Sequence, residues 1–304
     1  MLVVAIVGAC SQAHPLAATS PSVGQASCRL PIVIIEASGP SQGAFVTYPG
    51  GKVALDPAGV GGLSYDRAQS RWLPVPSNEV AADGSRYAYT DRKVPGTLGQ
   101  QKLHVVDVST GQDRVYALSS ASDTSSYVVI EVATEGVWLT YSGYESPRGG
   151  LFMVDPSSGG MKDVGGDHTM FDSVAGGRGF FWFTDPGPHP QTSAGMGSIL
   201  PARVQRFTVA DGKTEAWFTR DGSYMTVLGT DLAGHPIVTD GTSVWLASSP
   251  ADAKVIGVPA AYYLVFADSH GVWLGATTGI FLYSAAGVVR KVTDQAATPT
   301  GPCA

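Results

Sequence analysis

The chain has 304 residues, including 38 Gly and 20 Pro, and only 14% of its residues are charged. With 19 Lys and Arg against 25 Asp and Glu, the formal net charge is −6, and no basic run is concentrated enough to indicate nucleic acid or an anionic membrane surface. This length and composition fit one large all-β domain.

The first ten residues, MLVVAIVGAC, form an apolar run that ends in small residues before Cys10. The ending Val-Gly-Ala-Cys resembles the bacterial lipobox, whose cysteine is lipidated and becomes the mature N-terminus. The run departs from that pattern because no Lys or Arg precedes it and because it is short for a signal peptide. We expect residues 1–10 to be a lipoprotein-type signal segment with Cys10 as its lipidation site. A buried first strand over residues 2–7 is the alternative.

Residues 11–27 are rich in Ser, Ala and Pro and are predicted to be a flexible tether, followed by a single domain over residues 28–304. Cys28 lies just before the first repeated unit and Cys303 lies just after the last. A disulfide between them would join the two ends of the domain and would stabilise it by about 4–5 kcal/mol in the chain-entropy model. Two free thiols near the chain ends are the alternative.

Short β-prone runs, each closed by small turn residues, recur along the chain. One run appears six times, as VALDP (53–57), AYTD (88–91), WLTY (138–141), WFTDP (182–186), IVTD (237–240) and WLGA (273–276). A weaker strand precedes each run, as YVVIEV does from Tyr127, and two further strands follow it. Six such four-stranded units indicate an all-β fold of the β-propeller type. A seventh blade, near residues 28–40 or between 185 and 240, is the alternative.

The pieces GVWLGATTGIFLYS (271–284) and VQRFTVADGKTEAWFT (204–219) resemble blades of bacterial periplasmic and secreted propellers. These families include the two-component-regulator propeller repeat, the TolB-type WD40-like repeat and the virginiamycin B lyase propeller. The resemblance covers roughly residues 40–295 at the level of the blade pattern. It implies the propeller fold, and it assigns no activity and no catalytic residue to this sequence.

Three consecutive units carry long connections after their second strands, at Asp91–Gln101, Ser142–Gly150 and Asp185–Pro201. Function concentrates in long loops on a rigid scaffold, so we predict a binding rim there, against the alternative of simple drift in loop length. Tyr, Trp and Arg dominate recognition surfaces, and Trp182 is expected to be core rather than rim. The candidate residues for a ligand or partner are Arg92, Tyr141, Tyr144, Glu145, Arg148, Asp185, His189 and, from the loop 165–172, His168.

A metal site is not expected. His168, His189 and Asp185 could form a metal-binding or proton-transfer group, but no ligand spacing supports it, and solvated histidines are the favoured interpretation. Four predicted second strands end in Asp56, Asp91, Asp185 and Asp240, whose carboxylates could hold a cation. Ordinary turn aspartates explain them more simply. No nucleophile, phosphate-loop or dinucleotide motif is present, and no cofactor is predicted.

The first functional interpretation is a membrane-tethered, extracytoplasmic propeller that binds a protein, peptide or glycan at the cell envelope without catalysis. Its location would be the periplasm or the cell surface, and its only membrane contact would be the lipid anchor. Two alternatives stay open: a propeller lyase or hydrolase acting in the central channel, and a structural component of an envelope complex.

Overall fold

The computed structural model describes residues 27–304 except 35–38, 92–99, 119–124, 144–149, 166–173, 178, 186–201, 221–224 and 257–261. The described residues are almost entirely β-strand and turn, and their one helical element is the short 3-10 turn η1 (Ser77–Glu79). None of the helical structure described is long and apolar enough to cross a membrane.

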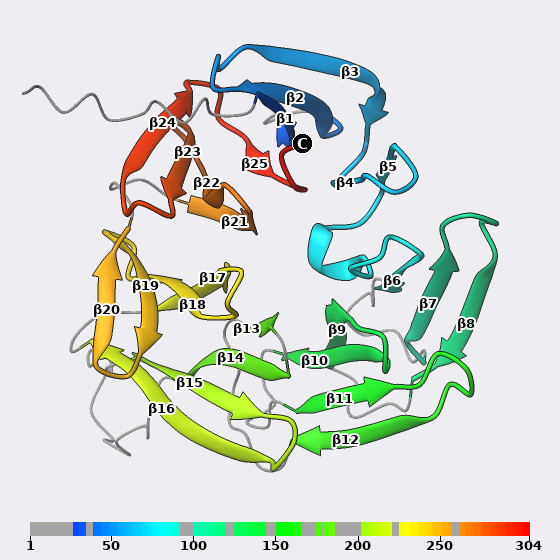
Figure 1. The fold of residues 1–304 in the computed structure, drawn as a ribbon. Helices are drawn as coiled ribbons and strands as arrows, with labels where there is room; N and C mark the ends of the chain where they lie inside the picture. The colour runs from blue at the N-terminus through cyan, green and yellow to red at the C-terminus, as the bar shows by residue number, and fades with distance from the viewer. Residues whose placement is uncertain are drawn as a thin grey trace, which may run out of the picture.

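Strands pair antiparallel in sheets that are arranged radially about a common centre (Figure 1). Blade 3 consists of β9 (Ser125–Val132), β10 (Val137–Gly143), β11 (Leu151–Val154) and β12 (Met161–Gly165). Blade 4 consists of β13 (Val174–Gly177), β14 (Phe180–Asp185), β15 (Ala202–Thr208) and β16 (Lys213–Arg220). Blade 5 consists of β17 (Thr226–Thr230), β18 (Pro236–Thr239), β19 (Val244–Ser249) and β20 (Asp252–Val255). Blade 6 consists of β21 (Tyr262–Asp268), β22 (Gly271–Ala276), β23 (Gly279–Ser284) and β24 (Val289–Thr293).

The two remaining blades have reduced inner strands. Blade 1 consists of β1 (Cys28–Ile34), β2 (Gln42–Tyr48) and β3 (Val53–Val60), with β25 (Thr298–Pro299) as its innermost strand. Blade 2 consists of β6 (Arg86–Thr90), β7 (Lys102–Asp107) and β8 (Asp113–Ala117). Its innermost position is held by a single bridge between Val80 and Tyr87. The described residues therefore form the six blades that the repeats predict.

The assignment of Val53–Pro57 to a second strand is wrong, because this segment begins β3, the outermost strand of blade 1. The ring takes its closing strand β25 from the C-terminal end, so β1 occupies the second position and each later strand moves outward by one. Residues 28–34, considered for a seventh blade, therefore belong to blade 1. The runs expected to complete the first unit instead form a separate hairpin of β4 (Ser64–Asp66) and β5 (Arg71–Leu73).

The core lies between blades, because a sheet that is apolar on both faces must be covered on both. In β22, for example, Val272, Trp273 and Leu274 are consecutive and all buried. Clusters of buried side chains join blade 1 to blade 6, blade 2 to blade 3, and each following pair up to blades 5 and 6.

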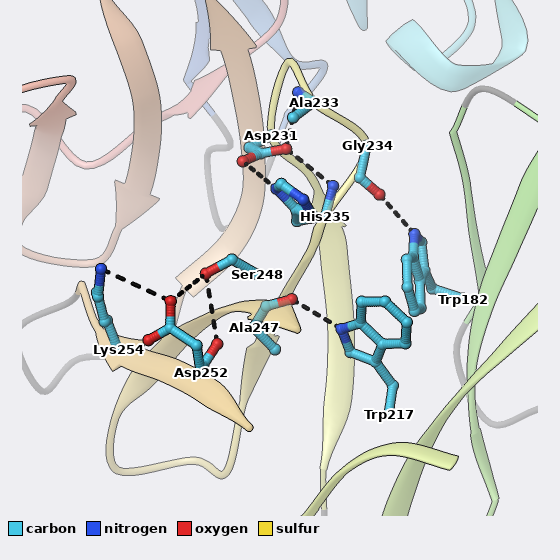
Figure 2. Close-up of polar contacts among 10 residues, drawn as sticks. All are labelled: Trp182, Trp217, Asp231, Ala233, Gly234, His235, Ala247, Ser248, Asp252 and Lys254. Carbon is cyan, nitrogen blue, oxygen red and sulfur yellow. Dashed lines mark hydrogen bonds and ion pairs between the residues drawn. The ribbon is translucent and has the colours of Figure 1, made fainter. Parts of the chain in front are cut away.

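Blades 4 and 5 are joined by two tryptophans of blade 4 whose indole N–H groups donate to carbonyl oxygens of blade 5 (Figure 2). Trp182 bonds the Gly234 carbonyl at 2.7 Å, and Trp217 bonds the Ala247 carbonyl at 2.8 Å. Trp182 is 1% exposed, which confirms the prediction that it belongs to the core. Each indole thus buries apolar surface between the two blades, and its single N–H donor has a hydrogen-bond acceptor.

The β4–β5 hairpin forms a wedge between blades 1 and 2. On one side, the rings of Tyr65 and Trp72 pack against Phe45 of blade 1, with centroids 5.0 and 5.7 Å away. On the other side, Leu73 and Val75 join a buried cluster with side chains of blade 2. Gly43 is required here, because a Cβ at that position would lie 2.5 Å from the Trp72 ring.

The predicted disulfide between Cys28 and Cys303 is confirmed, with the two Cα atoms 5.4 Å apart. It lies beside the pairing of β1 with β25 and closes the ring. The buried Asp268 carboxylate reinforces the closure, since it accepts the backbone N–H groups of Cys303 at 2.7 Å and His270 at 2.8 Å. The signal segment with Cys10 and the tether lie outside the described residues and stay predictions.

Candidate functional site

Antiparallel pairing fixes which connections share a face of the ring. The second and fourth strands of each blade end on the same side, so second-to-third connections and connections between blades emerge together. The strands β6, β10 and β14 end on this side, and in sequence they are followed by the connections 91–101, 144–150 and 186–201. The corresponding connections in blades 5 and 6 are short, at residues 240–243 and 277–278. We call this side the long-connection face.

The strands place two predicted site residues at this face. Tyr141 lies near the end of β10, opposite Tyr127 of β9, and Asp185 is the last residue of β14, opposite Arg203 of β15. Their side chains lie outside the description. The other predicted residues lie in undescribed segments, namely Arg92, Tyr144, Glu145, Arg148, His168 and His189. The binding rim, and the grouping of His168 with His189 and Asp185, therefore stay predictions.

The opposite face carries short turns that are held by aspartates. Asp107 accepts hydrogen bonds from Ser109 and Thr110, and these bonds hold the pKa of its carboxyl at about 2. Asp155 accepts bonds from Ser157 and Ser158 in the corresponding turn of blade 3, and its pKa is likewise about 2. A carboxylate that bonds its own turn in this way stiffens the loop and is not free for a ligand.

Three of the four aspartates considered as a cation ring have protein donors. Asp56 lies in the outer strand β3, where it accepts the Ala58 N–H and the Trp72 indole N–H, each at 3.0 Å. Asp240 accepts the N–H groups of Thr242 and Ser243, so both residues fit the turn interpretation. Asp91 lies 2.9 Å from the ring of His104. Within the described ranges, no group of three or more His, Cys, Asp or Glu could hold a metal ion.

The channel along the ring axis is a cavity of about 530 Å³, lined by the innermost segments of blades 2 to 6. Its wall mixes apolar side chains, such as Val80, Ile130 and Phe266, with polar ones, such as Asn78 and Asp231. Glu131 of β9 brings a carboxyl group into this wall and lies against Gly176 of β13, where a Cβ would collide with the carboxyl oxygen. Burial, with a smaller contribution from Glu135, raises the pKa of Glu131 to about 6.

Sequence reasoning missed Glu131, although a signal was present. In YVVIEV, a single charged residue interrupts a run of β-branched and apolar residues. A carboxyl in an innermost strand costs solvation free energy, and perturbed carboxyls are enriched at functional sites. The channel wall is therefore a second candidate surface for a ligand, beside the long-connection face.

Glu131→Gln is expected to flatten the decline of stability with rising pH. Because the folded protein holds the proton more tightly than the unfolded chain, the free energy of unfolding falls as pH rises from about 4.5 to about 6. Removing the titration should remove about 1 kcal/mol of that fall, after a discount for partial exposure. Urea denaturation at a series of pH values measures it.

Glu135→Gln is the matched control, because it removes only the smaller cause of the shift and should keep most of the slope. Burial raises the pKa of Glu79 to about 7, so that residue contributes a slope of the same sign in all three proteins. Equal slopes for Glu131→Gln and the unmodified protein would contradict the burial of a titrating Glu131 carboxyl.

No family model and no curated protein sequence matches this chain. Among solved structures, the extracellular domain of the putative one-component system BT4673 from B. thetaiotaomicron is similar, with a TM-score of 0.50 and 12% identity, covering 83% of this chain and 38% of that one. TolB from Acinetobacter baumannii is 12% identical over 91% of this chain and 65% of its own, with a TM-score of 0.48. A nidogen/laminin complex gives 8% identity over 88% of this chain and 90% of the other, with a TM-score of 0.47.

The chain spans less than two thirds of the first two of these structures. At such low identity the likeness to the BT4673 domain shows the fold alone, so the class of protein is a six-bladed β-propeller.

Proposed function

We propose that this protein is an extracytoplasmic β-propeller that binds a protein, peptide or glycan at its long-connection face, without catalysis. The observation that carries the proposal is the difference between the two faces. Described turns on the opposite face are short, and those between the third and fourth strands of blades 2 and 3 are tied by their own aspartates, whereas the second-to-third connections of three adjacent blades are long in sequence. Binding residues concentrate on long loops that a rigid scaffold positions.

The buried Cys28–Cys303 disulfide supports the location. Structural disulfides persist in secreted and periplasmic proteins and are rare in the reducing cytoplasm. The bond is also needed where it lies, because the ring is closed by a strand of only two residues. The disulfide therefore supports a location outside the reducing cytoplasm.

A thermal-shift screen against glycans, peptides, metabolites and metal salts tests the binding face. A ligand at one hundred times its dissociation constant stabilises the folded state by about 2.7 kcal/mol. The test variant changes Arg92, Tyr144, Glu145, Arg148 and His189 to Ala. The matched variant changes Gln112, Glu135 and Lys213, which are exposed on the opposite face.

The proposal predicts a shift that is present in the unmodified protein and the opposite-face variant and is lost in the five-residue variant. A shift lost only in the opposite-face variant would overturn it. Turnover of the bound compound would favour the lyase or hydrolase alternative.

A lipid anchor at Cys10 is the second part of the proposal. Cys10→Ser, expressed in a bacterium that processes lipoproteins, is expected to move the protein from the membrane fraction to the soluble extracytoplasmic fraction. Labelled palmitate should be incorporated by the unmodified chain and not by the variant. Ser20→Ala is the matched control, since it changes another residue of the same N-terminal segment, keeps the Cys28–Cys303 bond and should leave the label in place. If Cys10→Ser and the unmodified chain divide equally between the membrane and soluble fractions, the proposed lipid anchor at Cys10 is wrong.

A further inference from the structure

The wedge between blades 1 and 2 encloses a pocket of about 280 Å³ beside the central channel. The innermost strands of these two blades are short, being the two-residue β25 and a single bridge at Val80. The β4–β5 hairpin and the C-terminal residues 300–302 cover part of the space left, and a pocket remains between them and blade 2. Ser77, Val80, Ala82 and Phe266 border both this pocket and the channel, so the two spaces adjoin.

Asp66, at the end of β4, lines this pocket and is only 6% exposed. One carboxylate oxygen accepts the Ala68 N–H at 2.9 Å, but the other is buried and has no hydrogen-bond donor in the described protein. A buried acceptor without a hydrogen-bond donor lowers the stability of the fold, and the free-energy cost is larger for a charged acceptor than for a neutral one. Only glycine fits at position 84, where φ is +69° and a Cβ would lie 2.5 Å from the bonded Asp66 oxygen.

The charges around Asp66 favour a cation. Asp83 is the second carboxylate of the lining; its Oδ1 accepts the Ser85 N–H and hydroxyl, so Asp83 adds negative charge beside the pocket rather than a free acceptor. Arg67 is the one basic residue in the lining, and its guanidinium donates to the carbonyl oxygens of Pro302, Arg29 and Ala304. The basic group beside the pocket is thus engaged with the backbone of the ring closure, and the unpaired Asp66 oxygen is left for another donor.

The size and walls of the pocket indicate what kind of cation fits. A Ca²⁺ ion takes six to eight oxygen ligands, whereas this lining offers two carboxylates and apolar groups that include Val80, Phe266 and Pro302. An ammonium group carries three N–H donors, of which one would bond the unpaired Asp66 oxygen while the others stay hydrated, and an apolar body attached to it would cover the ring of Phe266. We infer that the Asp66 pocket binds a primary ammonium group carried on a small apolar body. This site does not involve the long-connection face, so it stands or fails separately from the proposed function.

Isothermal titration of the purified full-length chain with benzylammonium chloride tests the inference, with benzyl alcohol as the neutral probe and CaCl₂ as the metal probe. A hydrogen bond to a charged group corresponds to roughly a ten- to hundredfold change in affinity. Asp66→Asn should therefore weaken benzylammonium binding by that factor, and benzyl alcohol should bind the unmodified chain correspondingly weakly. Asp252→Asn, which changes an exposed carboxylate of blade 5, should bind as the unmodified chain does.

Ala82→Leu provides a second variant that keeps Asp66 and fills the pocket from its exposed side. It should lose benzylammonium binding without a change in melting temperature, which covers the case in which Asp66→Asn does not fold. Equal affinities for the amine and the alcohol, unchanged binding in either pocket variant, binding of Ca²⁺ alone, or no binding of any probe would each overturn the inference.

Discussion

Replacing Cys28 and Cys303 together by Ser is expected to lower the free energy of unfolding by about 4–5 kcal/mol in the chain-entropy model. The two cysteines are 275 residues apart in sequence, so their bond restricts nearly the whole unfolded domain. In the folded state the bond lies beside the shortest strand pairing of the ring, between β1 and β25. Urea denaturation of the variant and the oxidised protein measures the difference.

Reduction of the unmodified protein should reproduce the loss, and Cys10→Ser is the control for removal of a cysteine outside the ring. A loss below about 1 kcal/mol, at the low end of measured disulfide contributions, would contradict the account. It would mean that strand pairing, the Asp268 carboxylate and the Arg67 guanidinium hold the C-terminal residues without the covalent bond.

Trp182→Ala is expected to destabilise the protein by about 3–5 kcal/mol, the range for deletion of a buried aromatic side chain. Trp182, a residue of β14, is fully buried against blade 5, and its indole N–H donates a hydrogen bond to the Gly234 carbonyl. Trp182→Phe should cost less, because it keeps much of the apolar volume and removes the hydrogen bond. Thermal and urea unfolding of the three proteins measure both steps.

Trp245→Ala is a useful comparison, since this tryptophan of blade 5 is only partly buried and should cost less than Trp182→Ala. Equal losses for the two alanine variants would contradict the view that the Trp182 indole joins blade 4 to blade 5.

The blade count could be predicted because each blade repeats the same order of apolar runs and turns. The register of blade 1 could not, because its inner strand comes from the other end of the chain and the β4–β5 hairpin imitates two further strands. Local pattern cannot distinguish a strand within a blade from a hairpin packed beside one. The disulfide was predictable because the only cysteines near the two ends of the domain must meet once the ring closes.

The sequence could not single out Asp66 and Glu131, because the environment of each carboxyl group depends on residues that are distant in sequence. Asp66 lies in YDRAQS, which is typical of a turn, and Gly84, distant from it in sequence, lies against its carboxylate. Glu131 becomes a channel residue only when blade 4 places Gly176 beside it. Apart from Tyr141 and Asp185, the predicted rim residues lie outside the described residues, so their grouping on one face stays a prediction.

We propose that the long-connection face contacts the partner and that the opposite face is scaffold. In-cell photo-crosslinking from a matched pair of positions tests this most directly, with a photoreactive residue replacing Glu145 in one variant and the exposed Glu135 in the other. We expect a discrete adduct, detected by mass spectrometry, from position 145 and none from position 135. An adduct from position 135 without one from position 145 would contradict it.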